Sequence, residues 1–328
     1  MRLFPVAALC VPLCLGLALW AQKATPQATT PGQATTPGQP PAPGVDTSQP
    51  EAQFSASFTQ VNVLFTVTDK KGRFVTDLTV NDFEVIENKK SQFIQQFTAE
   101  SDLPLRLALL VDTSNSVAPQ FRFEQQAAIR FIDAVMRPRD DRMLLIGFDT
   151  TPELVSDLTG NIDTLEKGVN SMRPGGGTSL YDAIYFAAKE KLIKDQPREK
   201  FRRAMILISD GEDTQSRYTR DQALEMAQKA DTVIYAISTN GTREDKEGDL
   251  VLKYLTDETG GQAFFPFKPE DLDQSFENIA HELRHQYSIF YHPEPLITDG
   301  LYHPITVRVR TRKDLIVKAR KGYYAPKM

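Results

Sequence analysis

The chain has 328 residues, a formal net charge of −5 and an apolar fraction of 41%, which is the composition of an ordinary globular protein. The acidic balance argues against a nucleic-acid partner, because phosphate binding needs a basic surface. Both cysteines, Cys10 and Cys14, lie near the N-terminus, so a chain cleaved beyond them can form neither a disulfide nor a cysteine metal site.

The first residues predict export. Arg2 precedes an apolar run over residues 3–20, and Ala21 is a small residue that suits cleavage. The run is short for a spanning helix, so we expect a signal peptide over residues 1–21 and no membrane span in the mature chain. An uncleaved N-terminal anchor is the alternative. We therefore expect a periplasmic, cell-surface or secreted protein.

Residues 22–53 predict a disordered linker. This segment has no aromatic residue, is dense in Pro, Thr, Gln and Gly, and contains the sequence ATTPGQ twice in succession. Such a composition cannot bury enough apolar area to fold. Next come three strand-like runs, residues 61–69, 82–88 and 91–97, which are rich in β-branched and aromatic side chains. They predict a small antiparallel sheet within residues 54–102.

Strands and helices alternate from residue 105. Apolar strand-like runs occupy residues 105–112, 142–149, 203–210 and 232–238. Helix-like runs occupy residues 123–136, 179–193, 220–230 and 269–285. Continuous apolar strands separated by helices predict an α/β domain, residues 103–286, whose doubly wound and mostly parallel sheet is covered on both faces.

Strand character returns in the last segment, residues 287–328. The runs at residues 286–293, 303–311 and 315–326 are too few for a comfortable domain by themselves. We expect them to complete one small antiparallel β-sandwich with the N-terminal strands, so that the α/β domain is inserted in it. Two separate small sheets are the alternative.

Short oxygen-bearing side chains follow three of the predicted elements. Asp112, Ser114 and Ser116 follow the first apolar strand, at the sheet edge where doubly wound folds bind ligands. The loop PGGGTSLYDA places Thr178 at the start of a helix, and the strand ILISDGED ends in Asp210. Each residue alone is explained by a strand-end or helix cap. Together they predict a site for Mg²⁺, Mn²⁺ or Ca²⁺, which prefer oxygen ligands.

The set Asp112-x-Ser114-x-Ser116, with Thr178 and Asp210 on later loops, resembles the metal-ion-dependent adhesion site (MIDAS) of von Willebrand factor type A (VWFA) domains. With its flanking strands, the chain is similar to bacterial exported proteins in which such a domain interrupts a β-sandwich. The resemblance implies a Rossmann-like fold. It also implies that the three hydroxyls bind the ion directly and that the two carboxylates bind it directly or through water. An open coordination position would then take an Asp or Glu of a partner protein.

A second motif predicts an enzyme instead. HELRH, residues 281–285, matches the H-E-x-x-H pattern, in which His281 and His285 would bind zinc and Glu282 would be the general base. The apolar residues of this helix share one face, and both histidines fall on roughly the opposite face, toward solvent. His292 and His303 could supply a third ligand, but they lie near strand ends of another sheet.

We therefore expect an exported, divalent-cation-dependent protein-binding or adhesion module and not an enzyme. The alternatives are an envelope scaffold whose site is structural or empty, and a zinc metallopeptidase that uses the H-E-x-x-H motif.

Overall fold

The computed structural model describes residues 60–327, apart from residues 100–102, 198–199, 241–245 and 267–268. The predicted signal peptide, the predicted linker and the start of the predicted N-terminal sheet lie outside the described residues.

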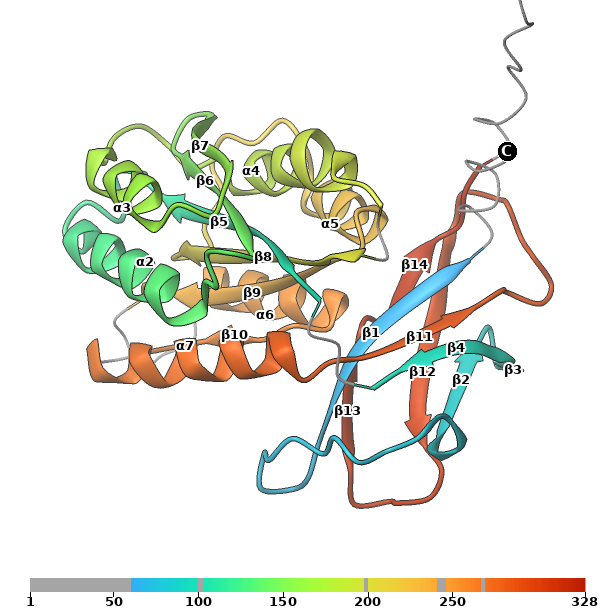
Figure 1. Cartoon of the computed structure of the whole chain (residues 1–328). Helices are drawn as coiled ribbons and strands as arrows, with labels where there is room; N and C mark the ends of the chain where they lie inside the picture. The colour runs from blue at the N-terminus through green and yellow to red at the C-terminus, as the bar shows by residue number, and fades with distance from the viewer. Residues whose placement is uncertain (1–59, 100–102, 198–199, 241–245, 267–268, 328) are drawn as a thin grey trace, which may run out of the picture. The chain divides into compact units, whose positions relative to one another are not determined.

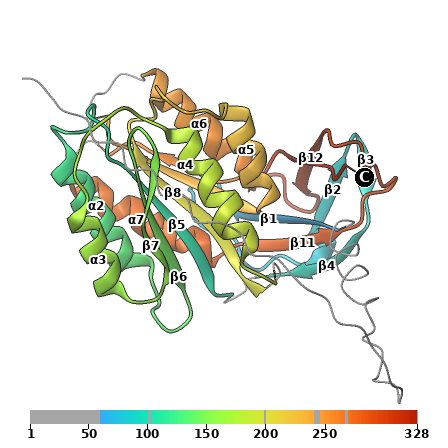
Figure 2. The ribbon, with the colours of Figure 1, turned by 90° about the horizontal axis from the view of Figure 1, so that it is seen from above.

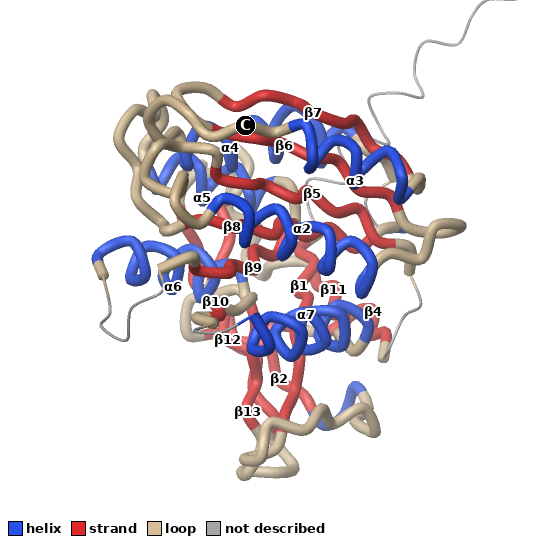
Figure 3. The backbone as a smooth tube through the Cα atoms, turned by 90° about the vertical axis from the view of Figure 1, so that its left-hand side faces the viewer, coloured by secondary structure: helices blue, strands red, loops and turns tan. Residues whose placement is uncertain are grey.

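A six-stranded sheet forms the centre of the α/β part, with the strand order β10-β9-β8-β5-β6-β7 (Figure 3). Its strands are β5 (Leu105–Asp112), β6 (Arg142–Phe148), β7 (Pro152–Thr159), β8 (Arg202–Ser209), β9 (Thr232–Ser238) and β10 (Ala263–Phe264). Neighbouring strands are parallel except β7, which runs antiparallel to β6. Every residue of β8 is buried, which explains why this strand is a nearly continuous apolar run.

Helices cover both faces of this sheet (Figure 2). One face carries α2 (Phe121–Val135), α3 (Ile162–Ser171) and α7 (Pro269–Arg284), and the other carries α4 (Leu180–Phe186), α5 (Arg220–Lys229) and α6 (Glu247–Thr259). Side chains alternate along each strand, so β5 feeds both cores: Leu107, Leu109 and Val111 enter the first, and Ala108 and Leu110 enter the second. The doubly wound α/β fold class is confirmed.

Two antiparallel four-stranded sheets accompany the α/β part (Figure 1). The first has the order β13-β1-β11-β4, from Ile316–Ala319, Val61–Thr68, Tyr287–Tyr291 and Ile94–Thr98. The second has the order β14-β12-β2-β3, from Gly322–Tyr324, Tyr302–Val309, Phe83–Glu87 and Lys90–Gln92. Side chains from both sheets, such as Phe65, Phe83 and Tyr287, form one core. The sheets therefore make a single β-sandwich, and the alternative of two separate sheets is wrong.

Strand pairing in the sandwich differs from the expected local arrangement. β1 and β4 are not neighbours, because β11 from the C-terminal segment pairs with both. The run at residues 91–97 is divided at Phe93, which is 77% exposed, into two strands that belong to different sheets. The run at residues 315–326 is likewise divided between β13 and β14. Each apolar run was long enough for one strand, and the corner within it depends on contacts with distant residues.

Two helices and both edge strands of the α/β part were not predicted: α3, α6, β7 and β10. Gly168 lowers the helix propensity of α3, but a Cβ at this position would lie 2.9 Å from Leu145 Cδ2, so the glycine allows α3 to pack closely on β6. β7 begins with Pro152, which is tolerated because β7 is at the edge of the sheet. The helix expected over residues 179–193 is α4 followed by a π-helical turn (Ala187–Lys191) and a 3₁₀ turn (Leu192–Lys194).

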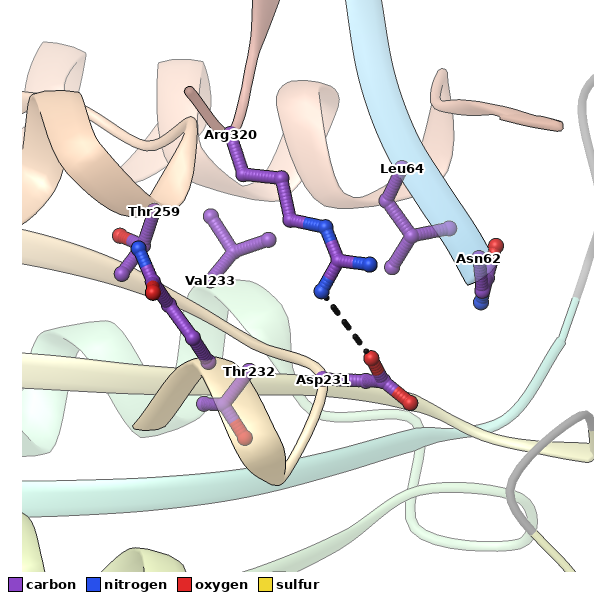
Figure 4. A pocket seen from close by; sticks show the side chains of 8 residues that line it. Asn62, Leu64, Asp231, Thr232, Val233, Thr259 and Arg320 are labelled. Atoms are coloured by element: carbon purple, nitrogen blue, oxygen red, sulfur yellow. Dashed lines mark hydrogen bonds and ion pairs between the residues drawn. The ribbon is translucent and has the colours of Figure 1, made fainter. Parts of the chain in front are cut away.

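Buried arginines join the sandwich strands to the α/β part. Arg202, which is 1% exposed, donates to the carbonyl of Leu283 at 3.2 Å and to that of Gln286 at 2.7 Å, at the point where α7 leads into β11. Arg320, directly after β13, reaches Asp231 at 3.2 Å beside the start of β9 (Figure 4). Within the described part of the chain, no helix combines the length and apolar character needed to cross a membrane.

Candidate metal centre

Asp112 is the last residue of β5, and both oxygens of its carboxylate are fixed. Oδ1 accepts a hydrogen bond from the backbone N–H of Ser114 at 2.9 Å, and Oδ2 accepts one from the hydroxyl of Ser209 at 2.7 Å. The residue has no exposed surface. Its position therefore follows from the buried strand before it and from the turn after it.

The hydroxyls of Ser114 and Ser116 meet next to this carboxylate. Their Oγ atoms lie 2.8 Å apart, although Ser114 is buried and Ser116 is exposed. Ser114 and Ser116, two positions apart in the turn after β5, thus bring their oxygens to one point. This pair of hydroxyls connects the buried Asp112 to the surface.

Thr178 lies on a loop that is bonded to the loops on either side of it. Backbone bonds join it to the first loop, from Gly175 N to the Thr113 carbonyl at 2.7 Å and from Asn115 N to the Gly176 carbonyl at 3.2 Å. Thr178 is buried, and its N–H donates to the hydroxyl of Thr214 on the third loop at 2.9 Å. The three predicted loops therefore form one connected edge.

Asp210 follows β8 and is held by two hydrogen bonds and by the close packing of the next residue, Gly211, on α6. Its Oδ1 accepts the N–H of Glu212 at 3.1 Å, and its carbonyl accepts the side-chain amide of Asn240 at 3.1 Å. Gly211 has φ +80°, and a Cβ there would lie 2.2 Å from the carbonyl oxygen of Gly248 in the first turn of α6. Glycine is therefore required at this position, both by the backbone conformation and by the contact with α6.

The carboxyl groups of Asp112 and Asp210 place two negative charges close together at a buried site. Burial raises the pKa of Asp112 from 3.8 to about 6, because the charged form loses its water. Hydrogen bonds from Ser114 and Ser209 act in the opposite direction, and the nearby carboxylate of Asp210 adds to the rise. A cation would relieve both the desolvation and the repulsion.

The donor set fits a hard divalent cation. Two carboxylates and three hydroxyls stand on loops that are bonded to one another, and all are oxygen ligands. Among the described residues, no three His, Cys, Asp or Glu side chains gather to hold a metal, so any ion here depends on the hydroxyls. Ser114, Ser116, Thr178, Asp112 and Asp210 stay the predicted ligands.

Two residues beside the site were missed from the sequence: Ser209 and Glu124. Ser209 Oγ bridges Asp112 and the N–H of Gly211, at 2.7 and 3.0 Å, but a serine at a strand end gives no separate signal. Glu124 on α2 is completely buried. The sequence did contain a signal for Glu124, because it lies three residues after the buried Phe121, on the apolar stripe of its helix.

The H-E-x-x-H motif does not assemble a catalytic zinc site. Glu282 is 3% exposed and points to the sandwich, where its Oε1 lies 3.0 Å from Lys318 Nζ and 3.3 Å from the Thr66 hydroxyl. His281 and His285 stack on each other with ring centroids 5.0 Å apart, and both stack on Phe74.

Of the two histidines considered as a third ligand for that motif, His303 is engaged elsewhere. His303 is buried in the sandwich, with Nδ1 3.3 Å from Glu87 and Nε2 3.1 Å from Asp299.

Comparison with known proteins bears on residues 107–212, which match the family model of the von Willebrand factor type A domain. Similar solved structures include BatB of Bacteroides thetaiotaomicron (18% identity, 54% of this chain, 98% of that chain, TM-score 0.44) and a von Willebrand factor type A protein of Catenulispora acidiphila (12%, 83%, 75%, 0.47). A third is mussel byssus proximal thread matrix protein 1 with a zinc-occupied MIDAS motif (15%, 60%, 50%, 0.48). No curated protein matches.

Proposed function

Taking residues 107–212 as a von Willebrand factor type A domain, we propose that this protein is a divalent-cation-dependent protein-binding module. The observation that carries the proposal is the meeting of the Ser114 and Ser116 hydroxyls, 2.8 Å apart, beside the fixed carboxylate of Asp112. Ser114, Ser116 and Thr178 would hold Mg²⁺, Mn²⁺ or Ca²⁺ together with Asp112 and Asp210.

Neutral hydroxyls are important for how such a site would act. They add no negative charge, so only the two carboxylates, which bind directly or through water, offset the charge of the ion, and the ion keeps an attraction for a further carboxylate. The exposed Ser116 supports an opening to solvent at this point. An Asp or Glu of a partner protein would complete the ion's coordination shell, and no bond would be broken. The net negative charge of the chain argues against a nucleic-acid partner.

A polar hollow beside the site supports a partner larger than a single side chain. It has a volume of about 400 Å³ and is lined by residues that include Thr113 of the first loop, Asp149, Glu153 and Arg173. Residues flanking the partner's carboxylate would lie here, and the charges of the hollow would select among partners.

The location that fits this role is outside the cytoplasm. The signal-like segment at residues 1–21 carries this part of the proposal, with the mature module periplasmic, on the cell surface or secreted.

The first test measures the ion. In wild-type protein, Mg²⁺ or Mn²⁺ at a hundredfold excess over Kd should add about 2.7 kcal/mol to the free energy of unfolding by mass action. Thr178→Ala and Asp112→Ala should abolish that gain while the fold is retained. Thr164→Ala is the matched control, since Thr164 is exposed on α3 away from the site. If neither ion changed the melting temperature of the wild type, the result would favour the alternative function, an envelope scaffold whose site is structural or empty.

The second test measures the partner. Proteins captured from envelope fractions by the wild type should be released by chelator and should not be retained by Thr178→Ala. Thr164→Ala should capture them as the wild type does. Capture that survives both chelator and Asp112→Ala would show that the binding does not use the cation.

A further inference from the structure

Two buried polar groups between the α/β part and the sandwich lack hydrogen-bond partners. Gln228, near the end of α5, is 3% exposed, and Arg320, directly after β13, is 9% exposed. Within the residues that the structure describes, Gln228 Oε1 accepts no hydrogen bond and Arg320 Nε donates none. Burying an unpaired donor and an unpaired acceptor is unfavourable for folding, so both require an explanation.

The other polar atoms of these side chains fix which atoms stay unpaired. The amide nitrogen of Gln228 donates to the carbonyl of Glu258 at 3.2 Å. Exchanging the amide oxygen and nitrogen would place an oxygen against that carbonyl, so the amide keeps this orientation. A terminal nitrogen of Arg320 reaches Asp231 at 3.2 Å, as Figure 4 shows, and holds the guanidinium group in place.

Both side chains line a small chamber and also a larger hollow. The chamber has a volume of about 10 Å³, which is room for one water-sized group. The hollow has a volume of about 470 Å³, within the range of roughly 300–1,000 Å³ that small-molecule sites have. Asn62, Gln228, Asp231 and Arg320 line both spaces. The two unpaired side chains therefore stand where the chamber adjoins the hollow.

The two unpaired atoms restrict the chemistry of a ligand that satisfies both. Its group must accept from the Nε–H of Arg320 and donate to the oxygen of Gln228. A carboxylate or phosphate group cannot donate, and an ammonium group cannot accept. An amide group does both, but it is larger than the space of the chamber. A hydroxyl group does both and has the size of the water that the chamber admits.

The walls of the hollow favour a neutral ligand with an apolar face. Four of its charged side chains form two ion pairs, because Lys229 lies 2.5 Å from Glu225 and Arg320 lies 3.2 Å from Asp231. Such paired charges create little attraction for a highly charged ligand. The half-buried Tyr324 also lines the hollow, and it offers an aromatic ring with a polar tip.

We propose that this hollow binds a saccharide, with one hydroxyl of the sugar in the chamber between Arg320 and Gln228 and a sugar ring along Tyr324. A sugar is neutral, its hydroxyls both donate and accept, and the C–H face of its ring packs on an aromatic side chain. The site shares no residue with the predicted cation site, so the proposal does not depend on the proposed function. The protein would then bind a saccharide at one place and a protein partner at another.

The experiment is saturation-transfer NMR on the purified protein with the methyl glycosides of glucose, galactose, mannose and N-acetylglucosamine. We expect the wild type to transfer saturation to at least one of them. Gln228→Met keeps the length of the side chain and removes the acceptor, so it should raise the Kd of that sugar at least about fivefold, the effect of one lost hydrogen bond. Gln95→Met is the matched control, because Gln95 is exposed on β4 and does not line the hollow.

A second variant tests the wall of the hollow without touching the buried groups. Tyr324→Leu removes the aromatic ring at a half-buried position and should also raise the Kd of the sugar at least about fivefold. Both variants should retain the circular dichroism spectrum of the wild type, which separates loss of the sugar from loss of the fold.

Three results would overturn the proposal. If the wild type transferred saturation to none of the four glycosides, the chamber would hold a water molecule only. Binding of equal strength in the wild type, Gln228→Met and Tyr324→Leu would place the sugar elsewhere on the protein. A signal that chelator abolishes would assign the sugar to the cation site.

Discussion

The substitution Asp112→Asn should stabilise the metal-free protein at alkaline pH. The pKa of Asp112 is raised from 3.8 to about 6 in the folded state, a difference of about 2 units or roughly 3 kcal/mol. Because the folded pKa lies above the unfolded one, this proton stabilises the fold fully below pH 3.8, and the contribution is lost as the pH rises through about 6. Above that range the ionised carboxylate costs the fold about 3 kcal/mol.

An asparagine keeps the geometry and removes the charge. Its Oδ1 can accept from Ser114 N–H as the carboxylate does, and its Nδ2 can donate to Ser209 Oγ. In chelator, the free energy of unfolding of Asp112→Asn should therefore exceed that of the wild type by up to about 3 kcal/mol at pH 8, and by less than about 1 kcal/mol at pH 4. Urea titrations followed by circular dichroism measure both differences.

Asp133→Asn, at an exposed position of α2, should show no such pH dependence. With saturating Mg²⁺ the order should reverse, because only the wild type gains stability from the ion. If Asp112→Asn were less stable than the wild type at pH 8 in chelator, the reasoning from buried charge would be wrong.

Three further changes test other parts of the structure. Arg202→Met leaves the carbonyl of Leu283 without its buried donor and should lower the free energy of unfolding by about 3 kcal/mol in urea titrations; an unchanged value would contradict the role of this arginine in joining the domains. Gly211→Ala places a Cβ 2.2 Å from the carbonyl of Gly248, so it should displace the third loop and raise the Mg²⁺ Kd at least about tenfold by calorimetry, and a wild-type Kd would refute this. Glu282→Gln should leave any peptidase background of the purified protein unchanged, and a loss of that background would revive the peptidase hypothesis.

The parts of the fold that could be predicted are those whose signal is local. The run LRLALLVD indicates a strand buried on both faces, and β5 is such a strand, ending at Asp112 as expected. Arg320 shows the limit of this reasoning. It stands inside the strand-like run at residues 315–326, which is broken there between β13 and β14, and its side chain reaches Asp231, 89 positions away. No local pattern encodes that ion pair.

The candidate site likewise has a part that local sequence signals predict and a part that depends on packing. The spacing of Asp112, Ser114 and Ser116 is a local motif, and the structure brings their oxygens together. Glu124 was not predicted because an acidic residue in the first turn of a helix is ordinary on grounds of the helix dipole. Only its position on the apolar stripe distinguishes it, and only the packing of α2 on the sheet shows that it is buried.

The insertion of the α/β part into the sandwich has a consequence for how the chain folds during synthesis. Thr66 on β1 contacts Glu282 at a separation of 216 positions, and β11 and β13, which pair with β1, come later still. At ribosomal rates of 5–20 residues per second, the N-terminal strands wait roughly 10 to 45 s for their partners. During that interval the apolar side chains of β1 have no sheet to join. The α/β part, whose strands pair over shorter separations, can fold in the meantime and bring the two halves of the sandwich within reach of each other.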